Sequence, residues 1–218
     1  MKNVVAFVAL FAVASLVSTN YAQETSAENK EACTGACPIA KAMDALPKMT
    51  YTVGEHSACC PDSAAVLAKK HKLPVTYVVG KKKFDKKDTA FVSLVEQTES
   101  YVNKFIEPCK CEVSGKTTIA GKTCDCPVEA GKTAELVKTA AKKVQMTYVV
   151  GEKTCNCPHE AASLAKTSGK AKVFVVGDQK TSCEHTARLT LAKAKYKAAV
   201  EALAAASKKA EPTKKAGT

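Results

Sequence analysis

Short runs of alternating apolar and polar residues recur along the chain, and each is followed by a glycine, a polar stretch and a run with helical spacing. Residues 147–150 and 172–176 alternate as half-buried β-strands do and are rich in β-branched side chains. The pairs Gly80-Lys81, Gly151-Glu152 and Gly177-Asp178 suit tight hairpin turns, because glycine tolerates positive φ. Four helical runs begin at proline, which fits the first helical position. This pattern predicts β-hairpins alternating with helices.

The same pattern occurs twice, in two copies related by a shift of 97 residues. The shift moves Met49-Thr-Tyr-Thr-Val-Gly-Glu onto Met146-Thr-Tyr-Val-Val-Gly-Glu and remains gap-free as far as Ala90. Each copy is predicted to run α–ββα–ββα, with a longer last helix over residues 89–105 and 186–205. We therefore expect an α+β fold of two tandem pseudo-repeats, residues 31–108 and 109–206. Each would be a small antiparallel sheet built from ββα units, with helices on one face.

The two ends of the chain differ from these copies. Residues 1–22 contain a basic Lys2, an apolar run and small residues up to Ala22, which is typical of a secretory signal peptide. The run is too short for a membrane span, so we expect a secreted or periplasmic protein with no transmembrane span after cleavage. Residues 23–30 are predicted to be a flexible segment. Residues 207–218, which are polar and rich in lysine, are predicted to be a disordered tail.

The charge of the chain is strongly basic, with a formal net charge of +12 at pH 7. Arg188 is the only arginine, and the lysines are spread over every segment. Because base and phosphate recognition relies on bidentate arginine, sequence-specific nucleic-acid binding is not expected. An acidic polymer or a membrane surface is the partner that a dispersed lysine surface would attract.

Eight of the eleven cysteines form four close pairs in which the second cysteine precedes a proline that begins a helix. At this N-cap position the unpaired amides and the helix dipole favour a thiolate, which is the metal-binding and nucleophilic form of the side chain. The paired cysteines, which are the candidate metal ligands, are Cys33, Cys37, Cys59, Cys60, Cys124, Cys126, Cys155 and Cys157.

The paired cysteines allow three interpretations. If neighbouring hairpins bring Cys33/Cys37 to Cys59/Cys60, and Cys124/Cys126 to Cys155/Cys157, each group of four thiolates would suit zinc or copper(I). The same groups, oxidised, would form disulfides that staple small exported sheets. Thiol–disulfide exchange is the third interpretation, although Cys-x-Cys-Pro lacks the usual Cys-x-x-Cys spacing.

The sequence contains no Gly-rich phosphate loop, nucleophile elbow or His-Glu-x-x-His motif, so a catalytic role has little support. We therefore expect an exported, non-catalytic protein that binds a soft metal ion through its cysteine pairs. The first alternative is a disulfide-stapled interaction or structural protein with a basic surface, and the second is a thiol–disulfide oxidoreductase.

Overall fold

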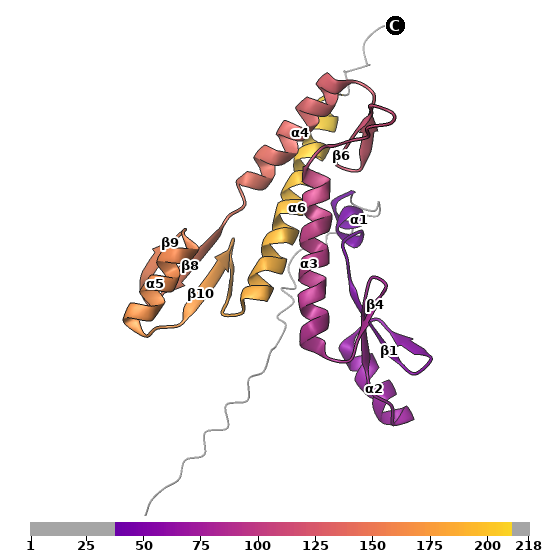
Figure 1. Ribbon diagram of the computed structural model, residues 1–218, viewed down its shortest axis with the longest axis vertical. Coiled ribbons are helices and arrows are strands. Elements are labelled where there is room, and N and C mark those ends of the chain that lie inside the picture. The colour runs from indigo at the N-terminus through magenta and orange to yellow at the C-terminus, as the bar shows by residue number, and fades with distance from the viewer. Residues whose placement is uncertain (1–37, 211–218) are drawn as a thin grey trace, which may run out of the picture. The chain divides into compact units, whose positions relative to one another are not determined.

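The computed structural model describes residues 38–210 of the chain (Figure 1). Its first half contains α1 (Pro38–Asp44), β1 (Met49–Val53), β2 (His56–Ala58), α2 (Pro61–His71), β3 (Thr76–Val79), β4 (Lys82–Phe84) and α3 (Lys87–Ile106). Its second half contains β5 (Cys109–Lys110), β6 (Thr117–Ile119), β7 (Lys122–Cys124), α4 (Pro127–Lys142), β8 (Met146–Val150), β9 (Lys153–Cys155), α5 (Pro158–Ser168), β10 (Lys172–Val176), β11 (Gln179–Thr181) and α6 (Glu184–Ala210). The predicted residues 1–22 and 23–30 lie outside the described part.

The strands form three small antiparallel sheets, which confirms the predicted α+β class. Two sheets have four strands, in the orders β2-β1-β3-β4 and β11-β10-β8-β9, and they correspond to each other under the 97-residue shift. The third sheet has the order β5-β6-β7 and lies in the second copy. Its hairpin, β6–β7, was not predicted. The turn there is Ala120-Gly121, with Ala120 at φ 51°, instead of a turn that begins with glycine.

The repeating unit of the fold is a hairpin followed by a helix, and it occurs five times (Figure 1). The fourth residue after each helix N-cap is a buried alanine whose amide donates a hydrogen bond to the carbonyl of the N-cap residue. An alanine leaves room for the first helical turn to lie directly on the sheet. These five alanines are Ala64, Ala90, Ala130, Ala161 and Ala187.

Each four-stranded sheet presents alternate residues to a core under the helices. In the second sheet Tyr148 pairs with Phe174 across the two central strands, and their rings meet edge to face at 5.7 Å. Leu164 of α5 packs against this cluster. In the first sheet Tyr51 and Tyr77 occupy the same two positions, with their rings 5.8 Å apart. Both copies therefore place an aromatic pair at these positions, which is buried in the second copy and half-buried in the first.

The last helices of the two copies pack on each other. Leu189 of α6 lies in a core cluster with Val79 and Leu94 of the first copy. Beside it, the Arg188 guanidinium donates two hydrogen bonds to the Glu99 carboxylate of α3, at 2.9 and 2.6 Å. This bidentate pair is the strongest geometry for an arginine and a carboxylate, so it fixes the register of α6 on α3.

Both long helices exceed their predicted bounds. Helix α3 spans Lys87–Ile106 and α6 spans Glu184–Ala210. Because α6 continues to Ala210, the tail predicted from residue 207 can begin no earlier than residue 211. Residues 211–218 lie outside the described part.

The short outer strands of the sheets carry many of the lysines. Strand β4 is an edge strand of three residues, and Lys82 and Lys83 on it are exposed. Lys153 on β9 and Lys180 on β11 lie on the two edges of the other four-stranded sheet. Lysine on a short edge strand prevents further strands from pairing there, which gives part of the basic surface a structural role.

Lys72 is expected to limit stability, because it ends α2 in the left-handed conformation at φ 55°. The shift of 97 residues places Gly169 at the same C-cap, with φ 66°. Lys72→Gly should raise the free energy of unfolding by about 0.5–1 kcal/mol, since glycine adopts positive φ without strain but loses more entropy on folding. Urea denaturation of the full chain measures the change.

Lys143 provides the matched control for this substitution. It is the C-cap of α4, but its φ of −68° is right-handed. Lys143→Gly should therefore lower the free energy of unfolding by about 0.5–1 kcal/mol. If the two glycine variants shift stability in the same direction, the left-handed conformation of Lys72 is not a source of strain.

Candidate metal-binding cysteines

The five hairpins share one register, and that register assigns each cysteine to a face. In each unit, the residue four positions after the first turn residue points under the helix, and we call this the inner position. The residue six positions after the first turn residue is the helix N-cap. The inner positions hold Ala58, Phe84, Cys124, Cys155 and Thr181, and the N-cap positions hold Cys60, Lys86, Cys126, Cys157 and Cys183. Only the third and fourth units therefore combine an inner cysteine with an N-cap cysteine.

Cys155 is the more buried of the two inner cysteines, with 7% of its surface exposed. It lies opposite Tyr148 across β8 and β9 and packs with Phe174 and Ala161. Burial raises the pKa of the Cys155 thiol, and the negative charges of Glu160 and the Cys157 thiolate raise it further. The two sulfurs of this pair are therefore close enough to repel each other when both are ionised.

Cys124 is its counterpart in the third unit. It is half-buried, lies opposite Thr117 and packs against the cluster that contains Ile119 and Val137. The same inner position is thus used in a second sheet, with a less enclosed sulfur.

The two N-cap partners, Cys126 and Cys157, are exposed. Neither side chain makes the capping hydrogen bond to its helix, so each sulfur lies at the helix N-terminus without a hydrogen bond to the first turn. The amides of that turn and the positive end of the helix dipole favour negative charge there. Each pair therefore combines a sheltered sulfur with an accessible sulfur two residues later.

Cys59 and Cys60 form a different arrangement. Ala58 takes the inner position, so Cys59 occupies the place that Asn156 has in the second copy. The Cys60 sulfur lies 3.0 Å from the Ser63 hydroxyl oxygen and accepts a hydrogen bond from the Ser63 amide at 3.4 Å. Hydrogen bonds from the Ser63 hydroxyl and amide lower the pKa of Cys60. Cys60 is therefore a thiol favoured in its nucleophilic form.

Cys111 and Cys183 share this lowered pKa. Hydrogen bonds from the Ser114 hydroxyl and amide lower the pKa of Cys111, and those from Thr186 do the same for Cys183. Both thiols are exposed. The described cysteines thus include three single thiols stabilised as thiolates by a nearby hydroxyl, and two inner–outer pairs.

Sequence reasoning missed the tyrosines beside these cysteines. Burial raises the pKa of Tyr148, and so do the charges of Glu184, Cys157 and Cys155. Burial likewise raises the pKa of Tyr51, together with the charges of Tyr77 and Cys60. A tyrosine of the central strand therefore lies near the helix N-cap in both copies. The repeated Met-Thr-Tyr segment was the signal that could have identified it.

The predicted groups of four sulfurs have different outcomes. Cys33 and Cys37 lie outside the described residues, so the first group cannot be traced. Cys124 and Cys126 follow a hairpin of the three-stranded sheet, whereas Cys155 lies on β9 of a four-stranded sheet. The condition for the second group is therefore not met in the structure: β6 pairs with β5, and the 16-residue α4 separates the two hairpins.

Within residues 38–210, no three His, Cys, Asp or Glu side chains are grouped so that they could hold a metal ion together. The nine cysteines of this part of the chain are all free thiols. The grouping that the structure does show is the pair.

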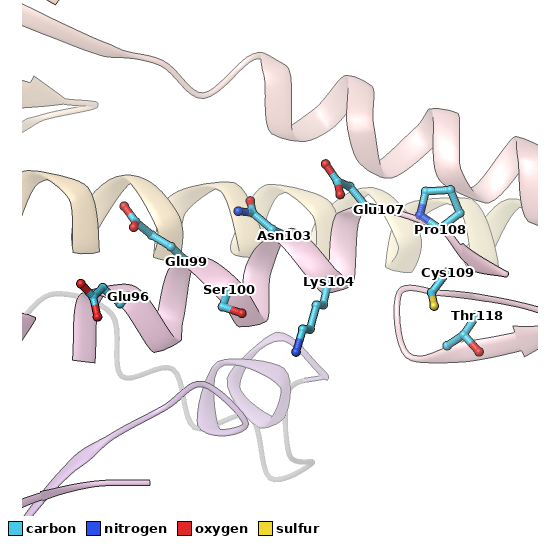
Figure 2. Close-up of a pocket in the computed structure, with 9 residues that line it drawn as sticks. All are labelled: Glu96, Glu99, Ser100, Asn103, Lys104, Glu107, Pro108, Cys109 and Thr118. Carbon is cyan, nitrogen blue, oxygen red and sulfur yellow. The ribbon is translucent and has the colours of Figure 1, made fainter. Parts of the chain in front are cut away.

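A groove runs along α3 and reaches Cys109 at one end (Figure 2). Its side chains follow one face of the helix and do not converge on a common point, and Cys109 and Thr118 lie at one end. Glu99, on its wall, is already paired with Arg188. The groove therefore lacks the convergent polar groups of a ligand site.

Comparison of the chain with protein-family models, with curated proteins and with solved structures finds no match. Among the helices of residues 38–210, none combines the length and the apolar character needed to span a bilayer.

Proposed function

We propose that the protein is an exported metal-binding protein in which each inner–outer cysteine pair holds one copper(I) ion. The two sites are Cys124 with Cys126 and Cys155 with Cys157. Export is proposed from the signal-peptide pattern of residues 1–22. Thiolates are soft ligands and select soft metal ions such as copper(I).

The placement of Cys155 and Cys157 is the observation that carries this proposal: a buried sulfur at the end of β9 is followed, two residues later, by an exposed cysteine at the N-cap of α5. Burial raises the pKa of Cys155, and the negative charges of Glu160 and Cys157 raise it further, so a bound cation would stabilise the Cys155 thiolate. Two thiolates and one copper(I) ion carry a net charge of −1. The N-terminus of α5, where Cys157 is the N-cap, stabilises a negative charge.

The donor set favours copper(I) over zinc. Protein zinc sites take four ligands in a tetrahedral arrangement. A pair supplies two sulfurs, which is the full donor set of two-coordinate copper(I). The buried surroundings of Cys155 would also shelter the bound ion from solvent and from oxidation, while the exposed Cys157 gives it a route in.

Copper(I) titration of the reduced, full-length protein under anaerobic conditions, against a competing chelator, tests the proposal. Cys155→Ser combined with Cys157→Ser should lower the number of bound copper ions by one. Cys183→Ser is the matched control, because Cys183 is an exposed cysteine at the N-terminus of α6 with Thr181 at its inner position. This control should retain the full affinity of the Cys155/Cys157 site.

The proposal fails if the double variant binds as many copper ions as the unmodified protein with the same affinities. It also fails if protein purified from its own host carries no metal and these four cysteines are in disulfides. That second result would favour the disulfide-stapled alternative.

A further inference from the structure

His56 and His71 form a pair of facing imidazoles in the first copy. His56 lies on β2 and His71 is the last residue of α2, yet their ring centroids are only 4.2 Å apart and their planes are inclined by 30°. The His56 side chain is exposed and that of His71 is half-buried. Solvent and solutes can therefore reach the pair.

Backbone geometry holds both histidines in place. His56 pairs with Val53 directly after the hairpin turn, which fixes its position on the sheet edge. Helix α2 ends immediately after His71, because the Lys72 amide donates to the Ala68 carbonyl from a left-handed C-cap. The backbone of both residues therefore belongs to ordered elements that lie against each other.

We propose that His56 and His71 form a chelating site for a divalent first-row transition ion, with copper(II) as the preferred occupant. A metal–nitrogen bond of about 2.1 Å, added to the distance from nitrogen to ring centre, places two neighbouring imidazole ligands about 4.5–5 Å apart, centre to centre. The observed 4.2 Å is within a small side-chain rotation of that value. Imidazole suits copper, nickel and zinc, and copper(II) binds most strongly in that series.

The electrostatic surroundings at the C-terminal end of α2 favour a bound cation. A helix C-terminus carries the negative end of the dipole, and the turn residue Glu55 adds a negative side chain next to His56. Lys69, Lys70 and Lys72 oppose the cation, but all three are exposed and their long side chains can turn into solvent. Bound water would complete the coordination.

This site is separate from the cysteine pairs. The pairs belong to the hairpins that precede α4 and α5, whereas His56 and His71 belong to β2 and α2, so the two proposals share no residue and no element. The imidazole site therefore does not depend on the proposed copper(I) binding by Cys124/Cys126 and Cys155/Cys157.

The second copy provides an internal comparison. The shift of 97 residues places Lys153 and Ser168 where the first copy has His56 and His71. Both histidines are thus absent together from an otherwise equivalent hairpin and helix. We therefore expect a copper(II) site of this kind in the first copy and none at the equivalent position of the second copy.

Copper(II) binding to the full-length protein, followed by electron paramagnetic resonance, tests this inference. Exposed thiols are first capped as methyl disulfides, so that the signal reports nitrogen ligands whether or not the cysteine pairs bind copper(I). The unmodified sequence should bind one copper(II) ion with two imidazole nitrogens. His56→Asn and His71→Asn should each weaken that binding at least tenfold.

His159→Asn is the matched control, because His159 is an exposed histidine on the first turn of α5, and it should leave the affinity unchanged. A gain-of-function variant keeps the test independent of any folding defect. Lys153→His combined with Ser168→His should add a second copper(II) ion of similar spectrum. The inference is overturned if the asparagine variants bind as tightly as the unmodified sequence, or if the double histidine variant gains no ion. Either result would leave the His56–His71 contact as ring stacking alone.

Discussion

Tyr196→Ala is expected to lower the free energy of unfolding by about 3–5 kcal/mol, the usual cost of deleting a large buried aromatic side chain. Tyr196 is 2% exposed on α6 and packs with Leu46 and Val102 of the first copy. Its ring meets Phe105 at 4.7 Å and Tyr101 at 5.6 Å, both nearly edge to face. Alanine would leave a cavity where the two copies meet.

Tyr196→Phe is the control, because it keeps the ring and removes only the hydroxyl. Burial raises the pKa of Tyr196, and a hydrogen bond with Tyr101 raises it further. Losing that bond should cost about 1 kcal/mol. Urea denaturation of the full chain should show one transition, displaced much further for Tyr196→Ala than for Tyr196→Phe. Equal displacement of the two variants would show that the aromatic contact does not join the copies.

Local signals in the sequence predicted the elements of the fold well. Gly80, Gly151 and Gly177 do begin hairpin turns with positive φ, and helices do begin at Pro61 and Pro158. These predictions succeed because turn and cap preferences depend on a few adjacent residues. The β6–β7 hairpin was missed for the same reason, since its strands have three residues each and its turn begins with alanine.

The candidate site was harder to predict, because it depends on register and on distant segments. The spacing of Cys59 and Cys60 resembles that of Cys155 and Cys157, but a difference of one residue puts Cys59 outside and Cys155 inside. Successive side chains of a strand point to opposite faces of the sheet. The spacing of two cysteines in the sequence therefore does not show which sulfurs lie close together. The predicted groups of four also required two hairpins to share a sheet, and no local pattern specifies which hairpins pair.

The buried alanine of each unit links the fold to the cysteine pairs. Ala161 is fully buried and lies in one core cluster with Cys155, Tyr148 and Phe174. Its counterpart in the third unit, Ala130, is also buried and follows Cys126 at the same spacing. A small side chain at this position lets the first helical turn approach the sheet, and that approach puts the N-cap sulfur near the inner sulfur.

Ala161→Leu is therefore expected to lower the free energy of unfolding by about 1–3 kcal/mol, because the added carbons have no space between α5 and the sheet. Ala162→Leu is the matched control. Ala162 is the next residue of the same helix and is exposed, so its substitution should change stability by no more than about 0.5 kcal/mol. Urea denaturation of both variants measures the difference. If Ala161→Leu is as stable as Ala162→Leu, the alanine does not set the distance between helix and sheet, and the close approach of Cys157 to Cys155 needs another cause.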